Sequence, residues 1–321
     1  MLRQFLPTDG ISRIFRALLA DSQVACDDGQ TVLPLQFLPN VRTMTETSLQ
    51  PARLVERPDG AADAPVDRFS AEELAQFDRA GFIIVRRLAA REICAQMTDW
   101  TRASLDGASG PAEFEADLNY PGAPTSRGAK GGDTVRRLKE VQSRHPAFTQ
   151  FVAGASLLVR LQQLLGPQVV MPLAHHNCVM TKQPRFSSET GWHQDIRYWS
   201  FARPELVSVW LALGRETPEN GSLYLIPGTH KLPIDRERLD DELFLRTDLA
   251  ENAALVSQKV PVELEQGDAL FFHCRTFHAA GRNRTDQIKL SAVFTFRPAD
   301  NSPQPGTRSA SMPELLLPPL G

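Results

Sequence analysis

The hydrophobic pattern changes near residue 168, and this change limits the folds that the chain can adopt. From residue 69 to about 165, apolar residues recur mostly at helical spacing. Beyond it, short apolar or alternating runs are separated by turn residues, as in strands. Strands are expected at 169–182, 206–213, 222–226, 255–264, 269–273 and 288–297. Helices followed by many short strands favour a mostly β fold with flanking helices, a double-sheet jelly roll.

The helical part carries clear start and stop signals. Ser70 and Glu73 have the spacing of a capping box, and Gly81 ends the helix that they begin. Further elements are expected as a short buried strand at 82–85 and helices at about 89–105 and 147–165. This order predicts helices packed on one side of the jelly roll.

Two segments are expected to be irregular. Residues 103–134 are rich in Gly, Ser, Asp and Pro, and we predict a long loop there, with a lid over the site as the hypothesis. Glu219-Asn220-Gly221 predicts a hairpin turn, because Asn-Gly tolerates positive φ.

Three parts of the chain differ in pattern. Residues 1–68 mix Pro, Asp, Gly and Ala and are expected to be a partly irregular extension, with one short helix at Ile11–Leu19. Residues 69–310 are expected to form the main domain, and residues 311–321 a tail. Met44 is an alternative start of the chain.

Composition excludes several function classes. The formal net charge is −3 and no basic stripe stands out, so nucleic acid is not an expected partner. No run of about 18 apolar residues exists, so no membrane span is expected. The four cysteines, Cys26, Cys94, Cys178 and Cys274, are scattered and form no C-x-x-C pair. Reduced thiols and a cytoplasmic location are the plain interpretation.

The strongest chemical signal is the segment from Gly191 to Ser200, which contains His193 and Asp195. In an extended segment, side chains two residues apart point to the same face. One imidazole and one carboxylate then share a point in space, and one more histidine completes the 2-His-1-carboxylate arrangement that leaves open positions on iron(II). Taken alone, a His-x-Asp pair is more often a surface ion pair.

The third metal ligand is sought in a later segment that contains both His273 and His278. His273 ends an expected strand, whereas His278 lies in the loop mouth beside Ala-Ala-Gly. The local pattern favours His278 as the ligand and leaves His273 a packing or supporting residue.

A candidate anion clamp follows at Lys289 and Ser291, which face the same side of an expected strand. Iron(II) with one carboxylate has a local charge of about +1 and a bound dicarboxylate about −2, so one more cation brings a desolvated site near neutrality. The plainer interpretation of Lys289 alone is a strand-edge lysine that reaches solvent.

Together, these segments resemble the phytanoyl-CoA dioxygenase family of iron(II)/2-oxoglutarate oxygenases. The matching motifs occur in family order: Trp192-His193-Gln194-Asp195, Asn220-Gly221-Ser222, Ile226-Pro227-Gly228-Thr229-His230-Lys231, and Gly267-Asp268 through His278 to Thr285. The entry segment from Leu74 to Val85 is also similar, so the resemblance covers roughly residues 69–297.

The resemblance implies a cupin-like double-stranded β-helix and a reaction that uses Fe(II), 2-oxoglutarate and O2. It implies a small-molecule substrate that is hydroxylated or desaturated, with release of succinate and CO2. The metal ligands carry over as His193, Asp195 and His278. Lys139 and Trp210 match positions where the family contacts the co-substrate. Halogenation is not expected, because related halogenases lack the carboxylate that Asp195 supplies.

One position departs from the family pattern. The family has arginine where this chain has Lys289, and lysine acts as a point charge rather than a bidentate fork. Arg282 or Arg284, in the preceding turn, is the alternative contact for the distal carboxylate. A small hydroxyl residue of the family is Ala280 here.

Substrate contacts are less defined. Arg197, Tyr198 and His230 are candidates for the substrate pocket, although packing or a surface position is the default for each. Two alternatives remain: a catalytically silent jelly-roll binder, and a cupin-like metalloprotein that does not use 2-oxoglutarate.

Overall fold

A computed structural model describes residues 53–54, 67–107 and 110–318 of the chain. The expected helix at Ile11–Leu19 and the alternative start at Met44 lie outside the described residues. The chain divides into two units, residues 1–46 and residues 47–321, and every described residue belongs to the second. Among the described residues, no helix has the length and apolar character needed to cross a membrane.

A large sheet forms one wall of the fold, and its central strands run in the order β6, β13, β8 and β11. All of these neighbours are antiparallel. Their bounds are Asn177–Lys182, Lys289–Pro298, Val207–Ala212 and Ala269–His273. Further strands extend this sheet: β1 Arg53–Leu54, β2 Phe82–Val85, β3 Ala112–Phe114, β4 Val135–Lys139, β5 Val169–Pro172 and β14 Glu314–Leu316.

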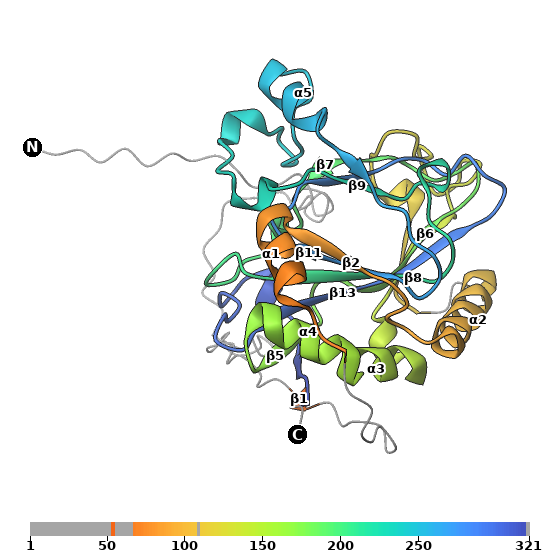
Figure 1. Ribbon diagram of the computed structural model, residues 1–321. Helices are drawn as coiled ribbons and strands as arrows, with labels where there is room; N and C mark the ends of the chain where they lie inside the picture. The colour runs from red at the N-terminus through yellow and green to blue at the C-terminus, as the bar shows by residue number, and fades with distance from the viewer. Residues whose placement is uncertain (1–52, 55–66, 108–109, 319–321) are drawn as a thin grey trace, which may run out of the picture. The chain divides into compact units, whose positions relative to one another are not determined.

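A small antiparallel sheet forms the opposite wall, in the order β10, β9, β12 and β7. Its strands span Val260–Pro261, Leu223–Leu225, His278–Ala280 and Thr190–His193. Figure 1 shows β7 and β9 above the large sheet, which runs through β13, β8, β11 and β2. Two facing antiparallel sheets make the expected jelly roll, so the mostly β fold of double-stranded β-helix type is confirmed.

Among the described residues, the first four α-helices pack against one buried cluster at the outer face of the large sheet, and the last packs against a separate cluster of Ile226, Leu245 and Phe277. The α-helices are α1 Ala71–Ala80, α2 Arg91–Gly107, α3 Pro146–Val152, α4 Ala155–Leu165 and α5 Ala250–Val256. Short 3-10 helices lie at Glu115–Asp117, Val141–Ser143, Asp195–Tyr198, Pro218–Asn220, Thr229–Lys231, Arg236–Arg238 and Arg308–Ala310. In Figure 1, α3 and α4 run beneath β13 and β8.

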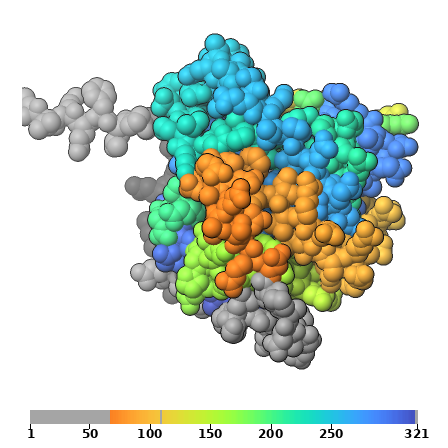
Figure 2. Space-filling model, in the orientation of Figure 1, coloured from red at the N-terminus to blue at the C-terminus, as the bar shows by residue number. Residues whose placement is uncertain are grey.

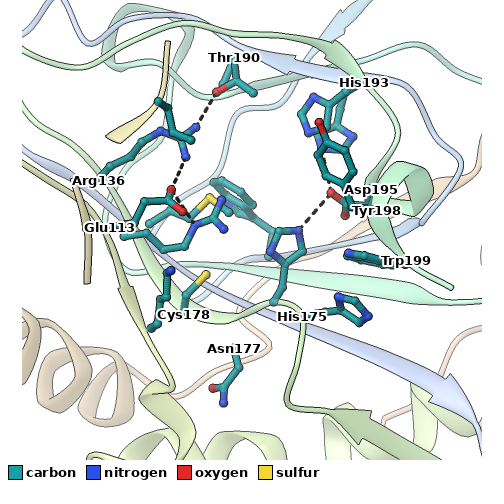
Figure 3. A pocket seen from close by; sticks show the side chains of 18 of the residues that line it. Glu113, Arg136, His175, Asn177, Cys178, Thr190, His193, Asp195, Tyr198 and Trp199 are labelled. Carbon is teal, nitrogen blue, oxygen red and sulfur yellow. Dashed lines mark hydrogen bonds and ion pairs between the residues drawn. The ribbon is translucent and has the colours of Figure 1, made fainter. Parts of the chain in front are cut away.

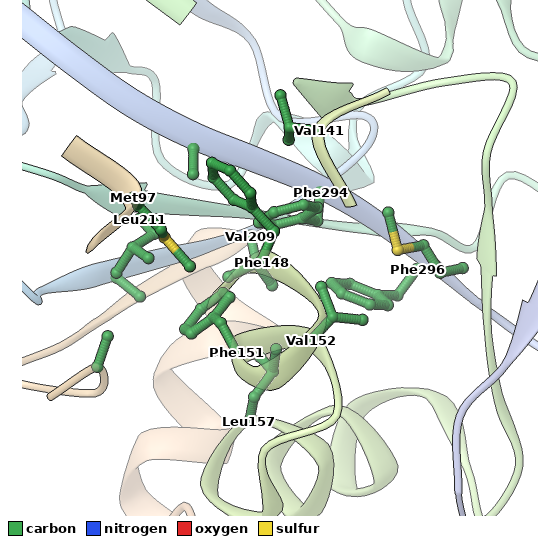
Figure 4. Close-up of a cluster of buried hydrophobic side chains, with 14 of the residues drawn as sticks. Met97, Val141, Phe148, Phe151, Val152, Leu157, Val209, Leu211, Phe294 and Phe296 are labelled. Atoms are coloured by element: carbon green, nitrogen blue, oxygen red, sulfur yellow. The ribbon is translucent and has the colours of Figure 1, made fainter. Parts of the chain in front are cut away.

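The main core lies between these helices and the large sheet. Phe148 and Phe151 of α3 meet Phe294 and Phe296 of β13, and all four belong to one buried cluster (Figure 4). Burial of each aromatic ring stabilises the fold by about 1.5–3 kcal/mol relative to exposure. The inner face of the large sheet packs partly against the small sheet in a second buried cluster, and other residues of this face line a cavity.

The entry helix α1 has the predicted capping box. Ser70 accepts from the Glu73 N–H, the Glu73 carboxylate accepts from the Ser70 N–H, and Gly81 ends the helix with φ 81°. A Cβ on Gly81 would lie 2.5 Å from Nδ1 of His230, so this position also needs glycine for space. On the face shown in Figure 2, α1 lies beside the 229–256 segment, where Lys231 pairs with Asp78 at 2.8 Å.

Several predicted boundaries are wrong. The strand expected at 255–264 is the end of α5 followed by β10, because the 250–256 segment is a helix whose Leu255 and Val256 pack against a buried cluster. The strand expected at 169–182 is divided into β5 and β6 by a turn at 173–176. The helix expected at 147–165 is divided into α3 and α4 at Gly154.

Other irregular segments contain more structure than the sequence indicates. The 103–134 segment includes the end of α2 and all of β3. The hairpin turn expected at Glu219–Gly221 is a 3-10 turn, in which Gly221 alone has positive φ. At the C-terminal end, β14 pairs with β5 and Leu317 is buried, so the sheet extends into the segment expected as a tail.

Candidate functional site

Three potential metal ligands meet where the small sheet faces the cavity. His193 ends β7, Asp195 begins the following 3-10 turn, and His278 begins β12. β7 and β12 are neighbours, and His193 pairs directly with His278 across them. One ligand atom from each residue lies within 4.8 Å of the other two. The predicted triad is therefore brought together by strand pairing.

Backbone carbonyls orient both histidines. Nδ1 of His193 lies 2.8 Å from the Gly191 carbonyl oxygen, and Nδ1 of His278 lies 3.0 Å from that of Thr276. A carbonyl can only accept, so each Nδ1 carries the proton and each Nε2 keeps a lone pair. Both imidazoles thus present a metal-binding nitrogen.

Asp195 is held by residues of the large sheet and of the preceding turn. The Ser208 hydroxyl of β8 donates to Oδ2 at 2.8 Å, and Nε2 of His176 lies 3.1 Å from Oδ1. Burial raises the pKa of Asp195, but the surrounding histidines outweigh burial and hold it well below its usual range. The carboxylate is ionised at neutral pH.

The protonation of the histidines follows from their surroundings. Burial lowers the pKa of His193, and the neighbouring His278 lowers it further. Burial also lowers the pKa of His278, against the attraction of Asp195. Burial lowers the pKa of His176 as well, yet its contact with Asp195 raises it to about 9. Two neutral imidazoles and one carboxylate form a donor set that suits iron(II).

A cavity of about 430 Å³ extends from this triad between the two sheets. Lys139, Trp210, Lys289, Arg197 and Tyr198, the candidates for co-substrate and substrate contacts, line it. Arg136, Arg137 and Lys182 also line it, and no motif in the sequence singles them out. Figure 3 places Arg136 and Glu113 on one side of the cavity, with His193 and Asp195 on the other.

The expected anion clamp has an internal partner. Lys289 donates to Glu216 at 3.1 Å, the Ser291 hydroxyl donates to the same carboxylate at 2.6 Å, and Trp210 Nε1 donates to both of its oxygens. Glu216 is 1% exposed and does not line the cavity, so it approaches the clamp from behind. Its backbone is fixed by two hydrogen bonds to Leu264.

This contact changes the charge expected at the clamp. Lys289 retains its place in the cavity wall, and it also donates to Ser291 at 2.9 Å. Its positive charge, however, is balanced by Glu216. A dicarboxylate therefore needs a further cation, and several others line the same cavity.

The alternative arginines lie elsewhere. The Arg282 side chain donates to the carbonyl oxygens of Ser187 and Arg185. The backbone N–H of Arg284 donates to the carbonyl oxygen of Glu219. Neither side chain lines the cavity, whereas Lys289 does. Of the three candidate contacts for a distal carboxylate, Lys289 is therefore the one placed to reach a ligand.

His230 and His273 are both outside the cavity. The prediction of His230 as a pocket residue is not supported, because its Nε2 lies 3.1 Å from the Asp78 carbonyl oxygen beneath α1. His273 accepts from the Arg275 N–H, and its ring lies 5.3 Å from that of His230. Burial lowers the pKa of His273 to about 4, as for a packing residue.

Of the two substrate-pocket candidates Arg197 and Tyr198, the first already contacts several other residues of the protein. Arg197 donates to Tyr120 and to the Glu242 carbonyl oxygen, and it lies 4.0 Å from the ring centre of Phe244. Tyr198 is 49% exposed at the cavity mouth. These residues are placed to contact a substrate at its outer end.

Comparison with known proteins agrees with this geometry. A family model described as phytanoyl-CoA dioxygenase matches residues 77–291. The chain is 23% identical over 243 residues to phytanoyl-CoA dioxygenase 1 of Oryza sativa subsp. japonica, covering 68% of this chain and 85% of that protein. It is 25% identical over 257 residues to ectoine dioxygenase of Sphingopyxis alaskensis, covering 74% and 78%.

A solved structure supports the fold. The crystal structure of EctD from S. alaskensis with 2-oxoglutarate and 5-hydroxyectoine matches with a TM-score of 0.60 at 22% identity. The match covers 84% of this chain and 89% of that chain. At this identity, the likeness establishes the double-stranded β-helix architecture.

Proposed function

The chain belongs to the phytanoyl-CoA dioxygenase family, and from this premise we propose that it hydroxylates or desaturates a small organic substrate. As a family member, it is a 2-oxoglutarate-dependent non-haem iron oxygenase. The proposed reaction consumes O2 and releases succinate and CO2. One observation carries the proposal: the ligand atoms of His193, Asp195 and His278 converge within 4.8 Å at a cavity wall.

The metal ligands are proposed as His193, Asp195 and His278. Iron(II) bound there would supply the oxygen-activating chemistry of the reaction. The chain's own residues orient the ligands: carbonyl oxygens hold the two Nδ1–H groups, and the Ser208 hydroxyl holds Asp195. Such supporting contacts typically change metal affinity 10- to 100-fold.

The co-substrate end of the cavity is proposed at Lys289 and Trp210, with Lys139 farther out. Lys289 and Trp210 line the cavity from adjacent strands, β13 and β8. Ser291 acts through Lys289, whose ammonium group donates to its hydroxyl at 2.9 Å. The ammonium group of Lys289 would bind the distal carboxylate of 2-oxoglutarate.

The cavity lining favours an anionic or strongly polar substrate. Seven cationic side chains line the cavity: Arg136, Arg137, Lys139, Lys182, Arg197, Lys289 and Arg308. Three carboxylates face them: Glu113, Glu140 and Asp195. The Nε of Arg137 has no hydrogen-bond partner among the described residues, and it lies 3.7 Å from Oε1 of Glu113. A volume of about 430 Å³ suits a small molecule.

An anaerobic titration of iron(II)-loaded protein with 2-oxoglutarate tests the proposal. We expect a visible charge-transfer band that saturates with 2-oxoglutarate and is lost in His278→Ala. His273→Ala is the matched control, because His273 lies outside the cavity, and it should keep the band. Absence of a band with iron bound would favour the cupin-like alternative without 2-oxoglutarate.

A further inference from the structure

Two lysines face each other across the inner surface of the large sheet. Lys182 at the end of β6 pairs directly with Lys289 at the start of β13. Both line the cavity, and they are only 8% and 3% exposed. Like charges directly opposite on neighbouring strands destabilise a sheet, and burial increases the cost. Such a pair requires negative charge nearby.

The protein itself supplies a carboxylate to one lysine of the pair. Glu216 binds Lys289 from behind the cavity wall. Lys182 donates to the Ser188 carbonyl oxygen at 2.5 Å, and among the described residues no carboxylate lies within 4.0 Å of its ammonium nitrogen. Lys182 is therefore the lysine whose charge is left for a ligand to balance.

The electrostatic surroundings of Lys182 agree with this assignment. Burial lowers the pKa of Lys182 to about 7, and the positive charges of Arg136 and Lys289 contribute to this, against the attraction of Glu115 and Glu189. These groups surround the lysine from several neighbouring strands and loops. A bound anion would favour the charged form and raise this pKa.

We propose that Lys182 and Lys289 together bind the distal carboxylate of 2-oxoglutarate, with Glu216 as the built-in counter-charge of Lys289. The inference rests on the proposed function, because it assigns part of the same co-substrate site. At the lysine end of the cavity, the charges of Lys289 and Glu216 cancel, so the distal carboxylate would leave one negative charge in excess. The charge of Lys182 cancels that excess.

The experiment is an anaerobic titration of iron(II)-loaded variants with two 2-oxo acids, followed by the charge-transfer band and by calorimetry. The acids are 2-oxoglutarate and 2-oxopentanoate, which has the same chain length without the distal carboxylate. In Lys182→Met, we expect 2-oxoglutarate to bind about 10- to 100-fold more weakly, as for a lost charged hydrogen bond. Binding of 2-oxopentanoate should change by less than about threefold, within the scatter of such contacts.

Two further variants separate charge from structure. Lys182→Arg keeps the charge and should retain most of the affinity. Glu216→Gln keeps the shape and the acceptor oxygen for Ser291 while removing the negative charge, so the double variant Lys182→Met/Glu216→Gln restores the charge balance. It should recover about tenfold of the lost affinity, because Lys289 then carries an uncompensated charge. A residue with only a structural role would not be rescued this way.

The outcomes are distinct. Unchanged 2-oxoglutarate affinity in Lys182→Met, or an equal loss for both 2-oxo acids, would overturn the two-lysine site while leaving the proposed function intact. A wild-type protein that binds iron and gives no band with either acid would overturn both. Loss for 2-oxoglutarate alone, with rescue by Glu216→Gln, supports the inference.

Discussion

Each wall of the cavity carries two residues of the same type that pair directly on neighbouring strands. We expect the pair on one wall to bind a cation and the pair on the other wall to bind an anion. On the small sheet, His193 pairs with His278, and their ring centres lie 4.2 Å apart. On the large sheet, Lys182 pairs with Lys289. Direct cross-strand pairing thus brings two histidines together on the small sheet and two lysines together on the large sheet.

The carboxylates beside the two pairs explain the difference. Asp195 sits with two histidines that burial keeps neutral, so the donor set of these three residues carries one negative charge and favours a cation. Glu216 sits with two lysines and balances only one of them, so the lysine end favours an anion. In each case a serine of the large sheet, Ser208 or Ser291, donates to the carboxylate. Similar scaffolding therefore yields opposite selectivity through the side chain at the paired position.

The largest effect is expected at the metal end. His278→Ala removes one of three proposed ligands and should weaken iron(II) binding by at least about 100-fold, beyond the 10- to 100-fold typical of supporting residues. Equilibrium metal titration measures this loss. His273→Ala should bind iron within about threefold of the wild type, as a residue outside the site. Equal metal affinity in both variants would show that His278 is not a ligand.

At the lysine end, the first effect is on stability. Lys289→Met leaves Glu216 buried without a cation and should lower the free energy of unfolding by about 3–5 kcal/mol. Denaturant unfolding measures this change. Lys289→Met/Glu216→Gln should recover most of the loss, since the uncompensated charge is gone. A loss below about 1 kcal/mol would show that the Lys289–Glu216 ion pair is weak. It would then not determine the charge of the lysine end as Asp195 determines that of the metal end.

The serine that supports Asp195 should matter less than a ligand. Ser208→Ala removes the hydroxyl that donates to Oδ2 at 2.8 Å, while His176 still contacts Oδ1. Iron(II) affinity should fall about tenfold, the lower end for supporting contacts. Metal titration with a fold check by circular dichroism tests this. No change would mean that His176 alone fixes the carboxylate.

An effect of similar size is a pH dependence of co-substrate affinity. Lys182 has a pKa lowered to about 7 by burial, with Arg136 and Lys289, and the bound dianion would hold it protonated. Binding then takes up a proton above that pH, so affinity falls as pH rises, by about tenfold from pH 6 to pH 8. Calorimetry in buffers of different ionisation enthalpy detects the proton uptake. Lys182→Met should lack this step, and its persistence there would assign it to another group.

Part of the site was predictable because it is local. Two residues apart on an extended segment, His193 and Asp195 share a face whatever the rest of the chain does. The capping box at Ser70 and Glu73 and the alternation of β13 at Lys289 and Ser291 are equally local. Sequence pattern also favoured a jelly roll over other classes, because many short apolar runs separated by turn residues are more typical of strands than of helices.

Other predictions failed where two periodicities compete. The apolar residues of the 250–264 segment fit a strand as well as a short helix, and packing of Leu255 and Val256 on a neighbouring cluster decided for the helix. The turn at 173–176 directly follows Pro172, a residue that disfavours one continuous strand, and it carries His176 to Asp195. His230 is a candidate for the pocket whose default is a surface or structural position, and the glycine at position 81 admits its ring beneath α1.

What the sequence by itself determined is the succession of a helical part and a strand-rich part, the caps of the first helix and the identity of the proposed metal ligands. What only the tertiary structure decided is the charge of the site. Glu216 reaches Lys289 across 73 positions of sequence, and Lys182 faces Lys289 only because β6 and β13 are paired in that register. The periodicity of the sequence indicates on which face of a strand a side chain lies. The balance of charge depends instead on the distances between charged groups, which the pairing of the strands sets.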